Sequence, residues 1–354
     1  MAKKKRNTGW ITVLILGVIV ALFVFIFVTK DSRGKLSQTT GQTGQEETAE
    51  GTEGQAPGAS ENKPDDNGTT EGASGNETEE TIVRKIDNSK QYLGLYANEP
   101  QLVKPVEDSI NTLGWFDTVD SPSKNKIAMC LDEHRYTAFI TLEPVNMPLG
   151  DIVAGTFDDE LTAYLENLSA GDRVNTELFI RFAHEMEMRD IYKTPWYPWQ
   201  SWDSELYVEA WRHVVTLGRE VAPNVKWVWS PNRADEFTIP YYPGDDYVDY
   251  VSMSLNDVAD RPSFAEFYEE IGRRDYLEAY NKPIIIGECA KSGADPQVRA
   301  DYIAGALDFI RDYEGCIGIM FFNEDVEESR QFRFTDEPTI VDTFNEHAAT
   351  WSRK

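Results

Sequence analysis

The chain has few of the residues on which several common functions depend. Its 354 residues include four histidines and three cysteines, Cys130, Cys289 and Cys316, and no two cysteines form a Cys-x-x-Cys pair. An odd number of widely spaced cysteines argues against a disulfide framework, and we expect free thiols. A His-Glu pair stands at 184–185, but Met188 occupies the position where a zinc-protease helix needs its second histidine. We therefore expect no metal ion and no organic cofactor.

Basic residues are also scarce. Formal net charge is −27, and nucleic-acid binding depends on Lys and Arg that neutralise phosphates, so no nucleic-acid partner is expected. The sequence has neither a Gly-x-Gly-x-x-Gly loop nor a Gly-Lys-Ser/Thr loop. The absence of both phosphate-binding loops argues against a doubly wound, nucleotide-binding sheet.

The N-terminus does contain one long apolar run. Residues 1–8 form a basic tail with Lys3, Lys4, Lys5 and Arg6, and no charge interrupts the run from Trp10 to Val28. About 20 apolar residues are enough to span a bilayer, so residues 9–29 are predicted to be a transmembrane anchor. The alternative is a cleaved signal peptide, but the apolar core is too long and no small-x-small site follows. The basic tail places the N-terminus in the cytoplasm and the rest of the chain outside the cell membrane.

Residues 30–80 differ from both neighbouring parts of the chain. They contain no aromatic residue, and within 31–80 twelve acidic residues stand against three basic ones. Such a segment cannot bury enough apolar surface to offset its conformational entropy. We interpret it as a disordered acidic linker that holds a folded domain, residues 81–354, away from the membrane.

The folded domain alternates strand-like and helix-like runs. Predicted strands are 91–97, 126–131, 137–143, 177–183, 225–230, 248–255, 283–287 and 316–322, and predicted helices are 101–113, 158–168, 204–221, 263–279, 296–313 and 339–351. Eight strands over this length indicate an α/β protein with the (β/α)8 TIM-barrel fold, although no helix is predicted after the second or fifth strand. A doubly wound sheet is the alternative fold.

Polar and aromatic side chains follow the strand ends of this predicted barrel, where active sites of the fold lie. The fourth strand ends at His184-Glu185, and the seventh ends at Gly287-Glu288. Two carboxyl groups on facing sides of a barrel mouth are what glycoside hydrolysis requires, one protonated and one ionised. The sequence therefore predicts Glu185 and Glu288 as a catalytic pair. Their separation, which decides between retention and inversion, cannot be obtained from the sequence.

Seven segments, in order, resemble glycoside hydrolase family 26, a β-mannanase-like family of barrels with catalytic glutamates on strands four and seven. They are Gly155-Thr-Phe-Asp158, Arg181-Phe-Ala-His-Glu185-Met, Trp196-Tyr-Pro-Trp199, Ala210-Trp-Arg-His-Val214, Lys226-Trp-Val-Trp-Ser-Pro-Asn232, Tyr241-Tyr-Pro-Gly-Asp-Asp-Tyr-Val-Asp249 and Lys282-Pro-Ile-Ile-Ile-Gly-Glu288. The resemblance implies a retaining enzyme in which Glu185 is the general acid/base and Glu288 is the nucleophile.

The resemblance and the strand ends together indicate a set of substrate-binding residues. This set is Arg181, His184, Trp196, Trp199, Trp229, Asn232, Asn256 and Phe322. The chain departs from the family at some of these positions. Asn256 stands where the family usually has a tyrosine that contacts the nucleophile, Phe321 or Phe322 stands where it often has tryptophan, and residues 187–194 lengthen the loop after the acid/base.

These observations predict a membrane-anchored, extracellular endo-β-1,4-glycanase with a monomeric catalytic domain and a polysaccharide substrate. β-Mannan is the first expected substrate, because it dominates the family that the chain resembles. Two alternatives stay open. One is a β-glucanase or xylanase of the same fold that acts on an exported polysaccharide. The other is a non-catalytic glycan-binding barrel, which the replacement of the expected tyrosine by Asn256 suggests.

Overall fold

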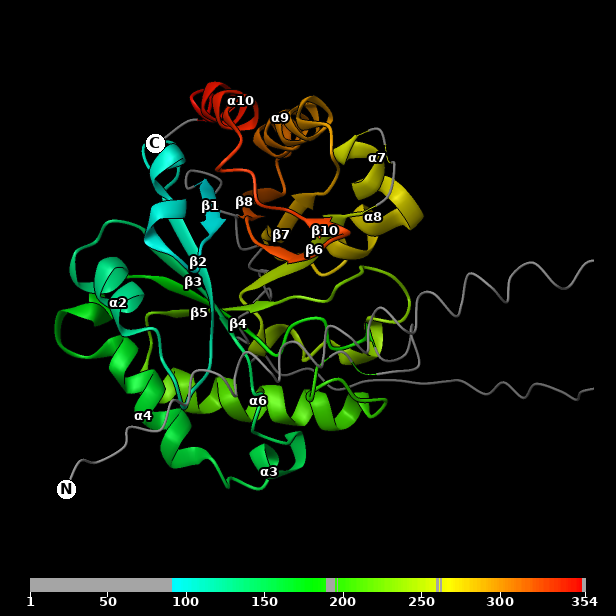
Figure 1. Ribbon diagram of the computed structural model, residues 1–354. Coiled ribbons are helices and arrows are strands. Elements are labelled where there is room, and N and C mark those ends of the chain that lie inside the picture. Colours follow the sequence, from blue (N-terminus) through cyan, green and yellow to red (C-terminus); the bar gives the residue numbers. More distant parts are fainter. Residues whose placement is uncertain (1–90, 189–194, 196, 259–260, 262, 352–354) are drawn as a thin grey trace, which may run out of the picture. The chain divides into compact units, whose positions relative to one another are not determined.

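Eight parallel strands form a closed barrel in the computed structural model, which describes residues 91–188, 195, 197–258, 261 and 263–351 (Figure 1). The strands are β1 (Tyr92–Tyr96), β2 (Thr112–Asp117), β3 (Thr137–Leu142), β4 (Leu178–Phe182), β5 (Val225–Trp229), β6 (Tyr250–Asp257), β7 (Ile284–Lys291) and β8 (Cys316–Phe322). Each strand pairs with the next, and β8 pairs with β1 through Tyr92–Gly318 to Tyr96–Phe322. This closure confirms the predicted (β/α)8 barrel and excludes an open, doubly wound sheet.

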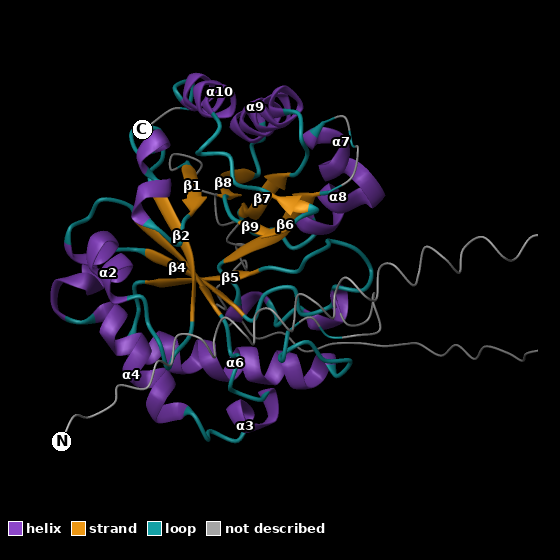
Figure 2. Ribbon diagram, viewed as in Figure 1, coloured by secondary structure: helices purple, strands orange, loops and turns teal. Residues whose placement is uncertain are grey.

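Helices surround the strands, as Figure 2 shows. They are α2 (Lys124–Ile127), α3 (Leu149–Val153), α4 (Asp158–Ser169), α6 (Ser204–Val221), α7 (Phe264–Glu269), α8 (Arg273–Glu278), α9 (Pro296–Asp312) and α10 (Pro338–Ala348). Short helical turns are η1 (Pro100–Leu102), η2 (Lys104–Val106), η3 (Ala128–Asp132), η4 (Gly171–Asn175), η5 (Ile239–Tyr241), η6 (Asp245–Tyr247) and η7 (Glu270–Gly272), and β9 (Asp325–Glu327) and β10 (Arg330–Gln331) form a hairpin after β8. The sequence predicts no helix after the fifth strand, and the structure has only the short turns η5 and η6 between β5 and β6.

The second β/α unit differs from the prediction. Residues 101–113, predicted as a helix, form η1, η2 and the start of β2, and residues 126–131, predicted as a strand, are helical in α2 and η3. Gly114 explains why β2 fits inside the barrel, because a Cβ there would lie 2.9 Å from the Met320 side chain and 3.0 Å from the Tyr96 ring. The apolar run around Leu131 packs in the layer between sheet and helices, which suits a helix as well as a strand.

The predicted helix 263–279 is two helices. The chain breaks at Gly272, whose φ of 75° is a left-handed conformation that glycine adopts at little cost. As a result, α7 and α8 turn relative to each other and bring Arg273 to the mouth of the barrel.

The predicted basic tail, anchor and linker lie outside the described residues. Among the residues that the structure does describe, no helix has the length and apolar character needed to cross a bilayer.

Candidate active site

A cleft of about 370 Å³ opens at the ends of the strands, and both Glu185 and Glu288 line it. Glu185 comes from the exit of β4, and Glu288 lies in the last half of β7. Only 5% of Glu185 and 4% of Glu288 is exposed. The two carboxyl groups are therefore largely removed from bulk water, and their immediate neighbours determine their charge.

Two side chains hold the Glu288 carboxylate. The Arg181 guanidinium donates to Oε1 through Nη2, and the Asn256 amide donates to Oε2 at 2.7 Å. Each carboxylate oxygen thus has its own donor, and one donor carries a full positive charge. This arrangement stabilises the ionised form and fixes the orientation of the group. Asn256 thus donates a hydrogen bond to Glu288, whose partner could not be settled from the sequence.

Arg181 is itself buried at the centre of the barrel and is fully inaccessible to solvent. Its Nε donates to Thr141 Oγ1 at 3.0 Å, and its guanidinium lies 5.6 Å from the centre of the Tyr96 ring and 5.9 Å from that of Phe116. Gly287 leaves room for it, since a Cβ at that position would lie 3.3 Å from Nη1 and would clash with Ser252. The barrel interior is therefore built around a cation whose counter-ion is Glu288.

The backbone that carries Glu185 is strained. Ala183 has a φ of 44° and Glu185 a φ of 54°, values that residues other than glycine rarely adopt. Four hydrogen bonds hold this turn: Glu185 N–H donates to Ser230, and the carbonyl oxygens of residues 183, 184 and 185 accept from Tyr207, Trp199 and Gln200. Strain of this kind persists only where the surroundings enforce it, and it is commonly found at functional sites.

Among the residues that the structure describes, Glu185 has no direct cationic partner. Asn232 donates to its Oε1 at 2.9 Å, and Ser254 also lines the cleft. Burial raises the pKa of Glu185, and the negative charge of Glu288 raises it further, against smaller opposing effects of Ser254, Asn232 and Arg181. Glu185 is thus suited to hold a proton at a pH at which ordinary glutamates have lost it.

His184, beside Glu185, is a neutral group. Burial lowers the pKa of its imidazole well below the usual value, and the Arg181 charge lowers it further. A ring nitrogen of His184 and carboxylate oxygens of Glu185 and Glu288 lie within 4.8 Å of one another, a spacing that would suit a metal ion. Arg181 already supplies the positive charge at Glu288, however, and a cation next to it would be repelled. The same three groups suit a sugar ring with a reacting anomeric carbon.

The close approach of the two carboxyl groups has a stereochemical consequence. Oxygens of Glu185 and Glu288 come within 4.8 Å of each other. In retaining glycosidases the two carboxyl groups are about 5–5.5 Å apart, whereas inverting enzymes leave about 6.5–9.5 Å for a water molecule. The short spacing here matches the retaining arrangement better than the inverting one.

Some of the other predicted substrate-binding residues line the cleft, and others do not. Asn232, Asn256 and Phe322 line the cleft. Trp199 and Trp229 do not, with exposed fractions of 1% and 0%. Trp199 stacks on Tyr197 with ring centres 4.6 Å apart, and Trp229 packs against Tyr242 and Tyr280. The prediction that Trp199 and Trp229 bind sugar is therefore corrected, because a buried indole offers no face to a ligand. Trp196 lies outside the described residues.

Several cleft residues were not predicted from the sequence. Phe116, Tyr197 and Phe332 line the cleft with Phe322, and so do four arginines, Arg233, Arg261, Arg273 and Arg330. Tyr197 lies one position beyond the predicted Trp196, and Phe116 lies in β2, of which only the start was predicted, as the end of the helix 101–113. The arginines come from loops, from α8 and from the short strand β10, where no periodic pattern indicates which way a side chain points.

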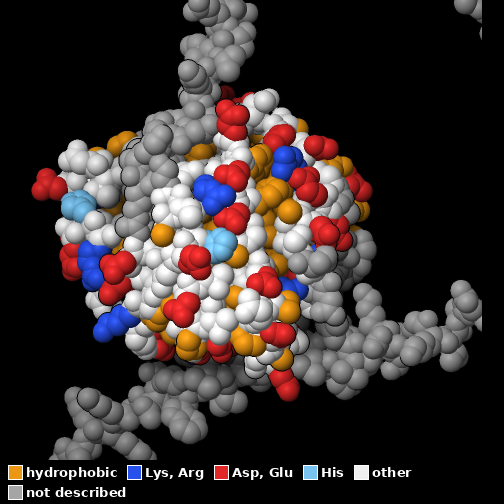
Figure 3. Space-filling model, turned by 90° about the horizontal axis from the view of Figure 1, so that it is seen from above, with side chains coloured by type: hydrophobic (Ala, Val, Ile, Leu, Met, Phe, Trp, Pro, Cys, Tyr) orange, Lys and Arg blue, Asp and Glu red, His pale blue; other side chains and the backbone are white. Residues whose placement is uncertain are grey.

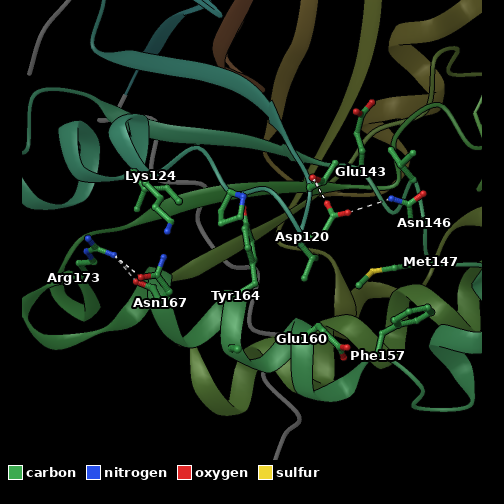
Figure 4. Close-up of a pocket in the computed structure, with 16 residues that line it drawn as sticks. Asp120, Lys124, Glu143, Asn146, Met147, Phe157, Glu160, Tyr164, Asn167 and Arg173 are labelled. Atoms are coloured by element: carbon green, nitrogen blue, oxygen red, sulfur yellow. Dashed lines mark hydrogen bonds between the residues drawn. The ribbon is translucent and has the colours of Figure 1, made fainter. Parts of the chain in front are cut away.

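A larger cavity of about 770 Å³ lies elsewhere, between the exits of β2 and β3 and the helices α2 and α4 (Figure 4). Its polar groups are satisfied locally: Asn146 donates to Asp120 at 3.2 Å, and Arg173 donates to the Asn167 side chain at 3.1 Å. The Glu143 carboxylate points away from the other labelled side chains. Size alone would select this cavity, but the buried, paired carboxyl groups lie in the smaller cleft.

A parallel eight-stranded barrel with two facing carboxyl groups at the exits of β4 and β7 is the framework of a glycoside hydrolase. Comparison with known proteins narrows this class. The model of glycosyl hydrolase family 26 matches residues 152–291, a range that contains both glutamates. Together with the closed barrel, this match supports the resemblance of the domain to glycoside hydrolase family 26.

The relatives carry different names. Endoglucanase H of Acetivibrio thermocellus is 30% identical over 224 residues, which cover 58% of this chain and 24% of that protein. A β-1,3-xylanase of a Vibrio species is 21% identical over 216 residues, 59% of this chain and 43% of that protein. A family 26 β-mannanase from Bacteroides ovatus has a TM-score of 0.54 at 12% identity and covers 74% of this chain and 89% of its own. The chain thus spans about a quarter to about half of the curated relatives that it matches, and the solved structure shows a shared fold alone.

Proposed function

We propose that the domain hydrolyses β-glycans with retention of anomeric configuration. The Glu288 carboxylate attacks the anomeric carbon while Glu185 gives its proton to the departing glycosidic oxygen, which leaves a covalent glycosyl-enzyme. Water then enters, Glu185 removes its proton, and the Glu288 carboxylate is released as the sugar is hydrolysed. Proton and charge balance in each half-reaction, and Glu185 ends protonated as it began.

One observation carries this proposal: two buried glutamates within 4.8 Å of each other have opposite environments. Glu288 is paired with a buried guanidinium, which favours the ionised nucleophile. Glu185 has no such pair, and burial raises its pKa, which favours the protonated acid. Two carboxyl groups whose surroundings separate their protonation states are the acid/base arrangement expected of a glycosidase.

The same geometry argues against a barrel that only binds glycans. Asn256 replaces the tyrosine expected from the family, yet it donates to Glu288 at 2.7 Å and so keeps a partner on that carboxylate.

We propose an endo-acting enzyme with β-1,4-mannan as the first substrate to test. β-Glucan is the second candidate, because the relative at 30% identity carries the name endoglucanase. Phe116, Tyr197 and Phe322 give the cleft apolar surfaces of the kind that pack against sugar rings.

The setting of the enzyme is part of the proposal. The apolar run from Trp10 to Val28, behind a basic tail, supports a membrane anchor with the barrel on the outer side, held away by the acidic linker. An enzyme tethered in this way would act on polysaccharide close to the surface of the cell.

Reducing-sugar release by the full chain, purified in mild detergent, tests the activity. The substrates are galactomannan, glucomannan, mixed-linkage β-glucan and xylan. Wild type is compared with Glu185→Ala, Glu288→Ala and a control, Glu160→Ala, which changes an exposed acidic residue of the larger cavity. We expect release from one polymer by wild type and the control, and loss in both active-site variants. Activity that survives Glu288→Ala would contradict the assignment.

A further inference from the structure

The wall of the catalytic cleft is rich in arginine. Arg233, Arg261, Arg273 and Arg330 line the cleft, and among its described lining residues Glu270 is the one acidic residue besides Glu185 and Glu288. This composition is opposite to that of the chain, whose net charge is −27. Figure 3 looks onto the side of the barrel domain that carries α9 and α10, and acidic side chains outnumber basic ones there.

Three of these arginines come together from different elements. Arg233 follows β5, Arg261 lies between β6 and α7, and Arg273 begins α8. The guanidinium carbons of Arg261 and Arg273 lie 4.2 Å and 4.8 Å from the centre of the Phe267 ring. Burial lowers the pKa of Arg273, and Arg233 and Arg261 lower it further by repulsion, against the attraction of Glu270. The fold therefore holds like charges close together, which requires a compensating interaction.

The acidic partners of these arginines mostly lie behind them. Arg233 pairs with Asp235 at 3.1 Å and Arg261 with Asp257 at 2.8 Å, and these two aspartates are 2% and 0% exposed and do not line the cleft. In contrast, the side chains of Arg233 and Arg261 are 32% and 30% exposed. A molecule that enters the cleft therefore meets the Arg233 and Arg261 guanidinium groups before it meets Asp235 and Asp257, and Glu270 is the described carboxylate exposed beside them.

Glu270, the acidic residue on this wall, is already shared. One of its oxygens, Oε2, accepts from Arg261 Nε at 2.9 Å and from Arg273 Nη1 at 3.3 Å. Arg273 is only 5% exposed, and its Nε has no hydrogen-bond partner among the described residues. A buried donor without a partner is costly, and an acceptor on a bound ligand would satisfy it.

We infer that the cleft takes a β-glycan that carries anionic groups, with a carboxylate or sulfate seated against Arg233, Arg261 and Arg273. This inference rests on the proposed hydrolase function and specifies its substrate class. Uronate carboxylates and sulfate esters each offer neighbouring oxygen atoms as acceptors. A guanidinium group can bind two such oxygens through two hydrogen bonds. Neutral hydroxyls need no such concentration of charge, and an exposed arginine group in an acidic protein also attracts anionic polymers over a distance.

The test uses one β-1,4-glucomannan in three forms: unmodified, carboxylated at C6 and sulfated. The full chain is assayed on each at low and high salt, beside Arg233→Gln and Arg261→Gln. Arg311→Gln is the matched control, because it removes the same charge from an ion-paired surface position on α9. Thermal unfolding checks each fold. Should Arg261→Gln unfold, the half-exposed Arg233 decides the test.

We expect the KM for one anionic form to be about tenfold below that for the unmodified polymer at low salt. High salt and either cleft variant remove the preference, and Arg311→Gln keeps it. The form that is preferred distinguishes carboxylate from sulfate. Equal or better use of the unmodified polymer, with the same salt response in Arg233→Gln and Arg311→Gln, would overturn the inference.

A binding measurement separates this inference from the proposed hydrolysis. The three polymers are titrated calorimetrically into Glu185→Gln, which keeps the Arg181–Glu288 pair but cannot give a proton to the leaving glycosidic oxygen. If wild type cuts none of the polymers, the hydrolase proposal fails on these substrates. The calorimetric ranking then decides the anionic preference by itself: tighter binding of an anionic form supports it, and equal or weaker binding contradicts it.

Discussion

Glu185 and Glu288 are chemically identical side chains at the exits of two strands of one barrel, yet their carboxyl groups have different surroundings. Glu288 lies within a regular strand and is held at both oxygens by Arg181 and Asn256. Glu185 lies on a strained turn, held through its backbone, and its carboxyl group contacts the neutral amide of Asn232. In the proposed mechanism the neighbours therefore set the chemical role: a fixed cation favours the ionised nucleophile, and burial without a described cationic partner favours the protonated acid.

The largest effect should follow from removing the nucleophile. We expect Glu288→Ala to lower kcat by about four orders of magnitude or more on polysaccharide and on activated aryl glycosides alike, because no covalent intermediate can form. Added azide should enter the vacated space and give a glycosyl azide of inverted configuration, identified by NMR. A variant with ordinary activity on an aryl glycoside would contradict the role given to Glu288.

Removal of the acid should give a different signature. We expect Glu185→Ala to lose about 10²–10⁴-fold in kcat on polysaccharide, where the leaving group needs a proton. The loss should be much smaller for an aryl glycoside with an acidic phenol, and azide should now give a product of retained configuration. Equal losses on both substrates would remove the distinction between the two glutamates.

The difference between Glu185 and Glu288 also depends on the Arg181 guanidinium that pairs with Glu288. Arg181→Lys keeps the charge but loses the planar fork that bonds Thr141 and Glu288 at once. We expect kcat to fall about tenfold or more while KM changes little, since the loss concerns orientation of the nucleophile.

The control for this variant is Arg299→Lys, because Arg299 is also a largely buried arginine but donates to the backbone carbonyls of Lys291 and Arg333. Its kcat should stay near that of wild type. The same loss of kcat in both variants would mean that Arg181 has only a structural role.

A third buried glutamate, Glu187, shows what burial alone does to a carboxyl group that has no proposed catalytic role. Glu187 is fully buried, Arg233 N–H donates to it at 2.7 Å, and burial raises its pKa from the ordinary 4.5 to about 8. Because the folded-state pKa lies above the unfolded one, the stability that protonated Glu187 provides is complete below about pH 4.5 and is lost as pH rises through about 8.

Glu187→Gln stays neutral at every pH, so it should escape this loss. We expect its free energy of unfolding, relative to wild type, to improve by about 5 kcal/mol between the two ends of that range, because each unit of pKa shift corresponds to about 1.4 kcal/mol. Urea unfolding at a series of pH values measures this difference, with the exposed Glu133→Gln as control. A constant gap between wild type and Glu187→Gln would show that Glu187 is not titrating in the folded state.

Much of the fold follows from periodicity and length alone. The predicted limits of α6 at Ser204–Val221 and β8 at Cys316–Phe322 agree with the structure to the residue. The error lies in the second β/α unit, where the segments assigned as helix and strand are the reverse of those observed. Segment 126–131 is short and mostly apolar, so its pattern does not separate a strand from a helix. Segment 101–113 has apolar residues at helical spacing (Val103, Val106 and Ile110), yet it forms short turns before β2. Close packing against Tyr96 and Met320 requires a small residue at Gly114, which the sequence pattern does not reveal.

Site residues at the ends of predicted strands could be found from the sequence, whereas residues placed by contacts across the barrel could not. Glu185 and Glu288 stand at strand exits, and their meeting in one cleft follows from the topology. Trp199 and Trp229 had the right residue type and the right neighbourhood, but the packing of Tyr197, Tyr242 and Tyr280 covers their faces. The arginine wall depends on the turn at Gly272 and on loops, whose directions the sequence pattern does not give.

The central claim is that Glu288 forms a covalent bond to the sugar while Glu185 manages the proton. Its most direct test is to inactivate the full chain with a 2-deoxy-2-fluoro β-glycosyl fluoride of the preferred sugar and to map the adduct by peptide mass spectrometry. The account predicts one glycosyl adduct, on Glu288, with retention of configuration in the normal product by NMR. An active enzyme that gives an inverted product, or an adduct on another carboxylate, would contradict it.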